Sequence, residues 1–341
     1  MAHLAFVFCC IVWGSTFILL ERVTHVLGPV EIGIWRMFSG AAAVAAVSWM
    51  RGHSLRLVRR DWLWLTFVAV IFTSPPQVIQ AYVLTHGLGH GFLGTLVAAI
   101  PLLTILASVP MLGIRPTSRE LIGVLGGLVC MGLILDDGVG RGMSLAILAL
   151  TALVPISSAL SNTVIKWKLP HVPAGPLTAG LLFVSALSMV PIQSSPVVLE
   201  SLDLAGPASA TVTSTTVLYM FLLGVVGSGM STMVFTWMIL ERGPLFAGMT
   251  TYVVPLLALF WGTLDSEAIS AQQMAAIAGV LAMVAMVQFG SRRVIENAAA
   301  DAGASIGIGE GFVSPIAAPE VEVPPRSSKL SEKVAVESLA S

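Results

Sequence analysis

Long apolar segments fill this chain from residue 3 to about residue 290. A helix needs about 20 apolar residues to cross the hydrocarbon core of a bilayer, whereas a barrel strand has only about 9–11 residues of alternating character. The segments have the helical length, so the sequence predicts an all-α integral membrane protein with ten transmembrane helices. The predicted spans are 3–20, 32–50, 62–83, 91–112, 119–136, 143–162, 175–194, 216–238, 244–264 and 271–290.

The overall composition excludes other classes of protein. The mean hydropathy is +0.92, 56% of the residues are hydrophobic and only 10% are charged, which is not the composition of an ordinary soluble domain. The formal net charge of -1 gives no electrostatic reason to expect a nucleic-acid partner. The lipid bilayer is therefore the expected surrounding of most of the chain.

The basic residues are concentrated in alternate gaps between the predicted spans. These gaps contain Arg51, Arg56, Arg59, Arg60, Arg115, Arg119, Lys166, Lys168, Arg242, Arg292 and Arg293. In the intervening gaps, the only basic residues are Arg22 and Arg141. Cytoplasmic loops are enriched in Lys and Arg, so the N-terminus and the C-terminus are both predicted to be cytoplasmic, an N-in/C-in topology.

Neither a cofactor nor a metal site is indicated by the residue pattern. The three cysteines, Cys9, Cys10 and Cys130, all lie in predicted spans and lack the spacing of metal ligands, so we interpret them as buried apolar side chains. The first span has no basic start and is expected to be retained as a helix rather than cleaved as a signal peptide. The segment 291–341 is rich in small, polar and charged residues, so it is predicted to be a disordered cytoplasmic tail.

The chain contains an internal repeat. Gly94 and Pro101 in the fourth span are separated by the same distance along the sequence as Gly248 and Pro255 in the ninth, and Leu-Leu follows each proline. A Gly-Val-Leu sequence then recurs in the fifth and tenth spans. The repeat predicts two five-helix units, 3–136 and 143–290. The alternative is that these short matches arise by chance between apolar helices of similar, biased composition. A unit with an odd number of spans must be inverted in its second copy, as in many secondary transporters.

These features together resemble a known family. The sequence Trp13-Gly14-Ser15-Thr16-Phe17 in the first span is similar to the start of EamA-type members of the drug/metabolite transporter superfamily. Arg36, the repeated proline, the span count and the N-in/C-in topology agree with that family, and the resemblance covers about residues 3–290. It implies export or exchange of small metabolites, often amino acids and sometimes drugs or nucleotide sugars.

The third span carries the densest group of candidate substrate-path residues. Pro75 and Pro76 lack backbone donors and are expected to kink the helix and act as a hinge, together with Pro101 and Pro255. Irregular backbone at membrane depth is tolerated only inside protein or beside a wet cavity. The polar side chains that follow are Gln77, Gln80 and Tyr82. They are interpreted either as part of a substrate path or as amides that tie helices together.

Further candidates lie in the first, sixth and ninth spans. Trp13, Ser15 and Thr16 form a polar and aromatic group near the middle of the first span, although hydroxyls there often bond to their own helix. Asn162 lies in the matching region of the second unit, which also contains Ser157, Ser158 and Ser161. Tyr252 precedes Pro255 and has a hydroxyl that needs a partner at this depth.

Apart from Arg119, the first residue of the fifth predicted span, Arg36 is the only cation within a predicted span, and it lies about one turn from the outer end of its span. It is interpreted as a structural anchor, neutralised by Glu31 or Glu21, or as a contact for an anionic substrate. His86 and His90 flank the turn that follows the third span and are expected to face water or to sense pH.

The favoured function is a membrane transporter that exports or exchanges amino-acid-like solutes by alternating access between the inverted repeats. A flippase or drug-efflux carrier for amphiphilic or lipid-linked substrates is the alternative. An enzyme is not expected, because the chain lacks the His-Glu-x-x-His and Gly-x-Ser-x-Gly motifs and the adjacent Asp136 and Asp137 are interpreted as a loop. The compact loops are typical of a bacterial inner-membrane protein, and small-residue faces leave a homodimer open.

Overall fold

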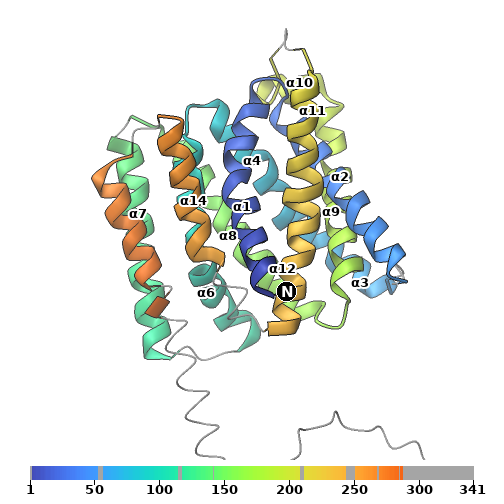
Figure 1. Ribbon diagram of the computed structural model, residues 1–341, viewed down its shortest axis with the longest axis horizontal. Helices are drawn as coiled ribbons and strands as arrows, with labels where there is room; N and C mark the ends of the chain where they lie inside the picture. Colours follow the sequence, from blue (N-terminus) through green and yellow to red (C-terminus); the bar gives the residue numbers. More distant parts are fainter. Residues whose placement is uncertain are drawn as a thin grey trace, which may run out of the picture. The chain divides into compact units, whose positions relative to one another are not determined.

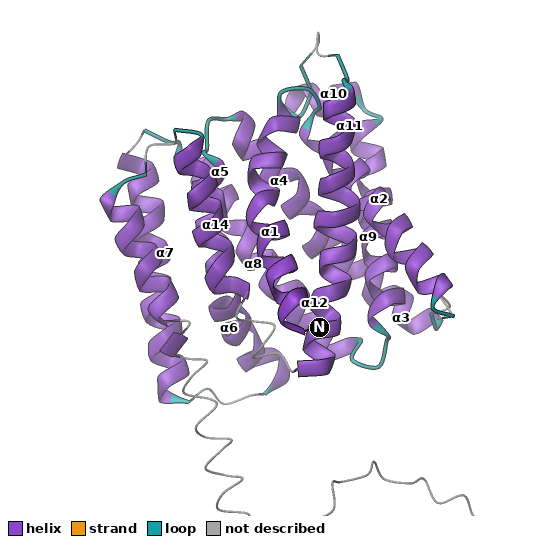
Figure 2. Ribbon diagram, viewed as in Figure 1, coloured by secondary structure: helices purple, strands orange, loops and turns teal. Residues whose placement is uncertain are grey.

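The computed structural model describes residues 2–52, 57–113, 117–140, 142–207, 211–242, 250–266, 269–283 and 285–286. Within these ranges nearly every residue lies in a helix and none lies in a strand, so the all-α prediction is confirmed (Figure 2). The predicted tail, 291–341, lies outside the described residues. The elements are α1 (Ala2–Thr24), α2 (Pro29–Met50), α3 (Arg59–Val68), η1 (Ala69–Thr73), α4 (Ser74–Thr85), α5 (His90–Leu96), η2 (Val97–Ala99), α6 (Ile100–Leu112), α7 (Ser118–Gly140), α8 (Leu145–Lys168), α9 (Ala174–Gln193), α10 (Pro196–Ser201), α11 (Ser214–Phe221), η3 (Leu222–Met230), α12 (Ser231–Arg242) and α14 (Thr250–Leu264).

Eight helical stretches are long and apolar enough to cross a membrane, and they coincide with the first eight predicted spans. They are His3–Thr24, Pro29–Met50, Arg59–Thr85, His90–Met111, Leu121–Gly140, Leu145–Lys168, Ala174–Gln193 and Ser214–Phe235. The ninth and tenth predicted spans overlap two shorter apolar helices, Val253–Leu264 and Ala271–Met283. Residues 244–249, 284 and 287–290 of these two predicted spans lie outside the described residues. The helices identify a multi-pass integral membrane protein.

Local sequence signals determine where several helices begin and end. Pro29 starts α2 directly after Gly28, because proline has no N–H to leave unpaired in a first helical turn. Ser144 caps α8 by accepting a hydrogen bond from the backbone N–H of Ile147 at 3.2 Å. Gly113 ends α6 with a φ of 66°, a left-handed conformation that glycine adopts without a steric penalty.

Two spans are interrupted by π-helical segments. The segment η1 separates α3 from α4 in the third span, and η3 separates α11 from α12 in the eighth. In both places a serine hydroxyl donates to the carbonyl five residues earlier, Ser74 to Ala69 at 2.7 Å and Ser228 to Leu223 at 3.1 Å. Such π-helical turns occur frequently at functional sites.

Helices from the first and second halves of the chain pack against each other. In Figure 1, α1 lies between α14 and α12, and it contacts both; α2 packs against α9 and η3, and α8 packs against α4 and α6. Small residues allow the closest approaches. A Cβ atom on Gly14 would lie 2.5 Å from Cβ of Leu257, and one on Gly94 would lie 2.5 Å from Cβ of Ala258. The largest hydrophobic cluster accordingly draws residues from both halves.

Apolar side chains cover outward-facing surfaces of the helices. On α7, Leu121, Leu125 and Val129 recur every four residues and are 50%, 55% and 65% exposed. An apolar stripe of this kind is unfavourable in water but is well solvated by the hydrocarbon core of a bilayer. The exposed stripe therefore agrees with the membrane location that the span lengths indicate.

The predicted loop at Asp136 and Asp137 is wrong, because α7 continues to Gly140. The two carboxylates accept hydrogen bonds from residues just before and at the start of the helix Ala271–Met283. Ser270 donates a hydrogen bond to Asp137 at 2.5 Å, and Gln272 donates one to Asp136 at 3.1 Å. These contacts satisfy acidic groups that would otherwise favour a loop.

Candidate functional site

A cavity of about 360 Å³, called here the central cavity, lies between helices from both halves of the chain. Residues of the first four spans and of the sixth to ninth spans line it. Its wall is mostly apolar and includes Phe17, Phe72 and Phe235. The polar side chains that line it are Thr16, Arg36, Thr73, Gln77, Gln80, Ser158, Ser161, Asn162, Thr178, Ser228, Thr232 and Thr250. An apolar pocket with a few convergent polar groups is the usual form of a small-molecule site.

Arg36 is buried beside this cavity and is only 7% exposed. The expected position one turn from the helix end is wrong, because α2 begins at Pro29 and Arg36 lies about two helical turns inside it. Its Nε donates a hydrogen bond to Ser228 Oγ at 2.7 Å. Its Nη1 is buried without a hydrogen-bond partner among the described residues. A buried cationic donor without a partner is energetically costly unless a ligand supplies one.

Neither of the acidic residues expected to neutralise Arg36 does so. Within the described ranges no carboxylate forms an ion pair with Arg36. Glu21 contacts His90 instead. The positive charge of Arg36 is therefore balanced by no neighbouring anion in the part of the chain that the structure describes.

Gln77 presents an unpaired acceptor in the same cavity. Its Oε1 is buried and has no hydrogen-bond partner among the described residues. Gln77 lies in α4, and its Cβ would be 3.8 Å from a Cβ on Gly33, which lies about one helical turn before Arg36 in α2. A cationic donor and a neutral acceptor thus line the cavity from two neighbouring helices.

The π-helical segment η3 holds the hydroxyl that binds Arg36. Its backbone touches α2 directly, and glycine is required on both sides of the contact. A Cβ on Gly229 would lie 2.8 Å from the carbonyl oxygen of Gly40, and a Cβ on Gly40 would lie 2.9 Å from that of Gly224. Because the two backbones meet, the short side chain of Ser228 reaches the guanidinium group of Arg36.

Trp13 connects the first span to the same segment. Its indole Nε1 donates to Ser231 Oγ at 2.8 Å and to the carbonyl of Gly227 at 3.2 Å. Its ring packs against Phe235, with the ring centroids 4.9 Å apart. The polar edge of Trp13 is therefore satisfied by protein, and its ring contributes apolar surface to the cavity.

Comparison with known proteins agrees with this arrangement. The model of the EamA-like transporter family matches residues 1–135. Over these residues the chain is similar to members of the EamA-like transporter family. The resemblance to the drug/metabolite transporter superfamily is confirmed, and members of this family are membrane transporters rather than enzymes.

A solved crystal structure, described only as that of a protein, has the same fold as this chain. The two superpose with a TM-score of 0.58 and 20% sequence identity, over 85% of this chain and 98% of the other. At this identity the similarity concerns the fold alone. No curated protein matches the chain.

The predicted path residues whose side chains the structure describes fall into two groups. Those that line the central cavity are Trp13, Thr16, Arg36, Gln77, Gln80, Asn162, Pro76 and Pro255. Ser15, Tyr82, Pro75 and Pro101 are not among its lining residues. Ser15 instead accepts a hydrogen bond from the indole of Trp261 at 3.0 Å. Tyr82 stacks on His86 near the end of α4, with ring centroids 4.1 Å apart. The side chain of Tyr252 lies outside the described residues.

Sequence reasoning missed Ser228 and Thr178, two polar residues of the cavity wall. A signal for Ser228 was present, since Gly224, Gly227 and Gly229 surround it in the middle of a predicted span. Glycine in an apolar span indicates a close backbone approach. It does not identify the residue across the contact, which for Ser228 lies 192 positions away.

A second polar cluster lies at the C-terminal end of α1. Glu21 contacts His90 at the start of α5, and Arg22 contacts Asp265 just after α14. His90 is 1% exposed, so the expectation that it faces water is wrong: helix α1 continues to Thr24 and brings Glu21 against it. The ligand atoms of Glu21, His90 and Asp265 lie within 4.8 Å of one another. Since Arg22 and His90 already contact the two carboxylates, we read the cluster as a closed contact between helices.

Proposed function

We propose that this EamA-like transporter carries small amino-acid-like metabolites through the central cavity. The observation that carries the proposal is the pair of unpartnered polar atoms, Arg36 Nη1 and Gln77 Oε1. A carboxylate would accept from the guanidinium group, and an ammonium group would donate to the amide oxygen. A zwitterion supplies both groups in one small molecule.

The remaining lining suits an apolar substrate side chain. Phe17, Phe72 and Phe235 provide aromatic surface, while hydroxyls such as Ser158 and Thr178 allow additional hydrogen bonds. The volume of about 360 Å³ lies at the lower end of the range for small-molecule sites. A bulky lipid-linked substrate fits this volume less well than a single metabolite.

The transport mechanism that we propose is alternating access between two inverted five-helix repeats, 3–136 and 143–290, in a ten-span bundle. The pattern of helix contacts supports it. Exchange of each span with the span five places later turns the α1–α14 contact into the α6–α8 contact, and the α2–η3 contact into the α9–η1 contact. The α2–α9 contact is converted into itself. A bundle without an internal two-fold relation has no reason to pair its helices in this way.

The positions of the π-helical segments agree with the same relation. They interrupt the third and the eighth spans, which correspond when the two repeats are superposed. Ser74 directly follows η1 and Ser228 lies within η3, and each hydroxyl donates to the carbonyl five residues earlier. The repeated prolines, Pro101 and Pro255, lie in the fourth and ninth spans, which also correspond when the two repeats are superposed.

The direction of transport that we propose is from cytoplasm to outside across an inner cell membrane. The cavity reaches Asn162 in the last turns of α8 and Thr178 in the first turns of α9. Those helix ends carry Lys166 and Lys168, the basic residues that indicate the cytoplasmic side. The contacts of Glu21 with His90 and of Arg22 with Asp265 close the opposite end of α1. Export would then begin with capture from the cytoplasm.

Flux measurements in proteoliposomes test the proposed substrate class. A panel of labelled amino acids with apolar side chains is compared with the amines that lack the carboxylate and with the acids that lack the amino group. We expect the amino acids to be carried best. The Arg36→Gln protein should lose about 10- to 100-fold in apparent affinity for the carboxylate-bearing compounds, the value of a hydrogen bond to a charged group. The Gln77→Leu protein should no longer distinguish amino acids from acids without the amino group.

Two matched variants serve as controls. Arg119→Gln removes an exposed charge at the start of α7, and Gln193→Leu removes an amide at the end of α9, and neither residue lines the cavity. Both should transport as the unmodified protein does. Transport of bulky amphiphiles that does not depend on Arg36 or Gln77 would reject the amino-acid proposal in favour of a flippase or drug-efflux carrier.

A further inference from the structure

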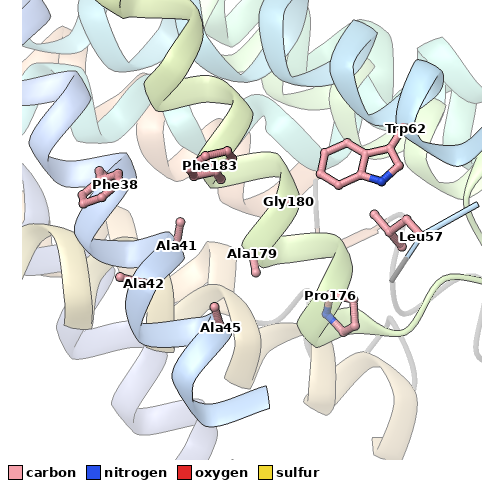
Figure 3. Close-up of a pocket in the computed structure, with 10 residues that line it drawn as sticks. All are labelled: Phe38, Ala41, Ala42, Ala45, Leu57, Trp62, Pro176, Ala179, Gly180 and Phe183. Carbon is pink, nitrogen blue, oxygen red and sulfur yellow. The ribbon is translucent and has the colours of Figure 1, made fainter. Parts of the chain in front are cut away.

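A second hollow lies on an outer face of the helices, apart from the central cavity. This hollow, called here the lateral groove, has a volume of about 340 Å³. Figure 3 shows Phe38, Ala41 and Ala42 on α2 to one side of α9, and Trp62 and Leu57 to the other side. The groove crosses α9 at its small residues, Ala179 and Gly180.

The lining of the lateral groove is apolar. Phe38, Trp62 and Phe183 stand partly exposed at 48%, 38% and 45%. Ala42 in α2 has an exposed side chain that leaves the space between the aromatic rings open. A groove of this kind at the depth of a membrane span is filled by hydrocarbon, because water would find no polar partner there.

Three arginines lie close in sequence to residues that line the groove, at the ends of the segments that carry Ala45, Leu57 and Trp62. Arg51 directly follows the last turn of α2, and Arg59 and Arg60 begin α3; Arg59 lies one helical turn before Trp62 and shares its face of the helix. All three have exposed side chains. No described residue forms a hydrogen bond or an ion pair with the guanidinium group of any of them. Asp61, which lies between Arg60 and Trp62 in the sequence, contacts His171 at 3.1 Å.

We infer that the lateral groove binds an anionic phospholipid, with an acyl chain across Ala179 and Gly180 and the headgroup phosphate at Arg59, Arg60 and Arg51. The apolar groove supplies the hydrocarbon site, and the unpaired arginines supply the charge that selects an anionic headgroup. The basic gaps lie on the predicted cytoplasmic side, where the headgroup of an inner-leaflet lipid would meet them. The inference is independent of which solute the central cavity carries.

A second copy of the chain is a poorer occupant of the groove. A symmetric dimer in one membrane would bring the same three arginines of each copy to the same face, where their charges repel. Helix pairs in membranes also associate through small residues that let backbones approach, whereas the exposed rings of Phe38 and Trp62 hold a neighbouring helix away. An acyl chain is flexible enough to lie between those rings.

Native mass spectrometry of the purified full chain tests the inference. The protein is incubated with phosphatidylglycerol or with phosphatidylcholine carrying the same acyl chains. We expect preferential retention of one phosphatidylglycerol molecule. In the Arg59→Gln/Arg60→Gln protein, the preference for phosphatidylglycerol should fall about five-fold for each arginine removed, which is the effect of one basic residue near an anionic surface. The Ala42→Phe protein, with its groove filled, should lose bound lipid of both kinds.

The controls separate the groove from the rest of the surface. Ala46→Phe adds the same ring at an exposed position of α2 outside the groove, and Arg119→Gln/Lys166→Gln removes two exposed charges from the same predicted membrane side. Both should keep the lipid. An unchanged preference in the Arg59→Gln/Arg60→Gln protein would overturn the inference, and so would conversion of a dimer to a monomer by Ala42→Phe. If Ala42→Phe prevents folding, the surface arginine variants alone decide.

Discussion

The two π-helical segments use the same local arrangement for different purposes. Directly after η1 and within η3, a serine hydroxyl donates to the carbonyl five residues earlier. The hydroxyl of Ser74 also meets Ser188 Oγ at 2.8 Å on α9, a contact between helices. The hydroxyl of Ser228 instead accepts from Arg36. One segment strengthens packing, and the other holds a charge beside the central cavity.

The sequences of the two segments explain this difference. Pro75 and Pro76 follow Ser74 at the end of η1 and lack N–H groups, so they interrupt the backbone hydrogen bonds of the helix there. In η3 glycine removes the side chains, and α2 approaches closely enough for Arg36 to reach Ser228. A π-helical turn therefore does not identify a functional site by itself. The groups left unpaired around it do so.

Replacement of Arg36 should separate function from stability most strongly. The Arg36→Met protein keeps the length of the side chain without its charge, so we expect flux of carboxylate-bearing solutes to fall by about 100-fold. The melting temperature in detergent should stay the same or rise, because a buried charge without a counter-ion is replaced by an apolar group. Transport assays and thermal unfolding on the same preparations check both expectations.

Loss of the serine hydroxyl that follows η1 should lower stability and leave transport largely unchanged. Ser74→Ala removes a buried donor to Ala69 and a contact with Ser188, and it should lower the free energy of unfolding by about 1–3 kcal/mol with little effect on transport. A large fall in the melting temperature of the Arg36→Met protein would show that the arginine is a structural anchor, as the alternative interpretation holds.

A direct comparison of the two serines should give a smaller effect on transport. Ser228→Ala leaves Arg36 Nε without its partner, so the guanidinium group loses its fixed orientation and KM should rise by about 5- to 10-fold. Ser228→Thr keeps the hydroxyl and should restore KM. Ser74→Ala should leave KM unchanged. Equal changes in KM for Ser74→Ala and Ser228→Ala would contradict the different roles that the structure indicates for the two segments.

The fold could be predicted well from the sequence because span length and charge distribution are local properties. The first eight spans were found to within a few residues, and the all-α architecture followed from them. Helix ends were less accurate, and they mattered. The predicted start of the second span at residue 32 put Arg36 near the surface, whereas the proline at position 29 starts α2 early enough to bury it.

The site was only partly predictable because its contacts join distant parts of the chain. Gln77 and Gln80 were named as candidates for the substrate path, and both line the cavity. The pairing of Arg36 with Ser228, and of Ser15 with Trp261, depends on how helices of the two halves pack. Neither spacing nor residue type contains that information. The orphaned atoms that suggest a substrate become visible only after every other hydrogen bond has been assigned.

The prolines of the fourth and ninth spans provide the smallest and most specific test of the comparison between the halves. Both were expected to be hinges, but their surroundings differ. Pro101 lies in the first turn of α6, just after η2, where no backbone donor is needed. Pro255 lies inside α14 and lines the central cavity, so its missing N–H interrupts the hydrogen bonds of that helix.

We therefore expect Pro255→Ala to restore a helical hydrogen bond, stiffen α14 and slow transport a few-fold while the binding affinity for substrate stays the same. Pro101→Ala should change neither quantity appreciably. Single-turnover flux combined with equilibrium binding separates the rate from the affinity. Equal slowing by both substitutions would indicate that the two halves bend alike despite their different helix starts. Weakened binding without slowing in the Pro255→Ala protein would instead make this proline part of the cavity wall rather than a hinge.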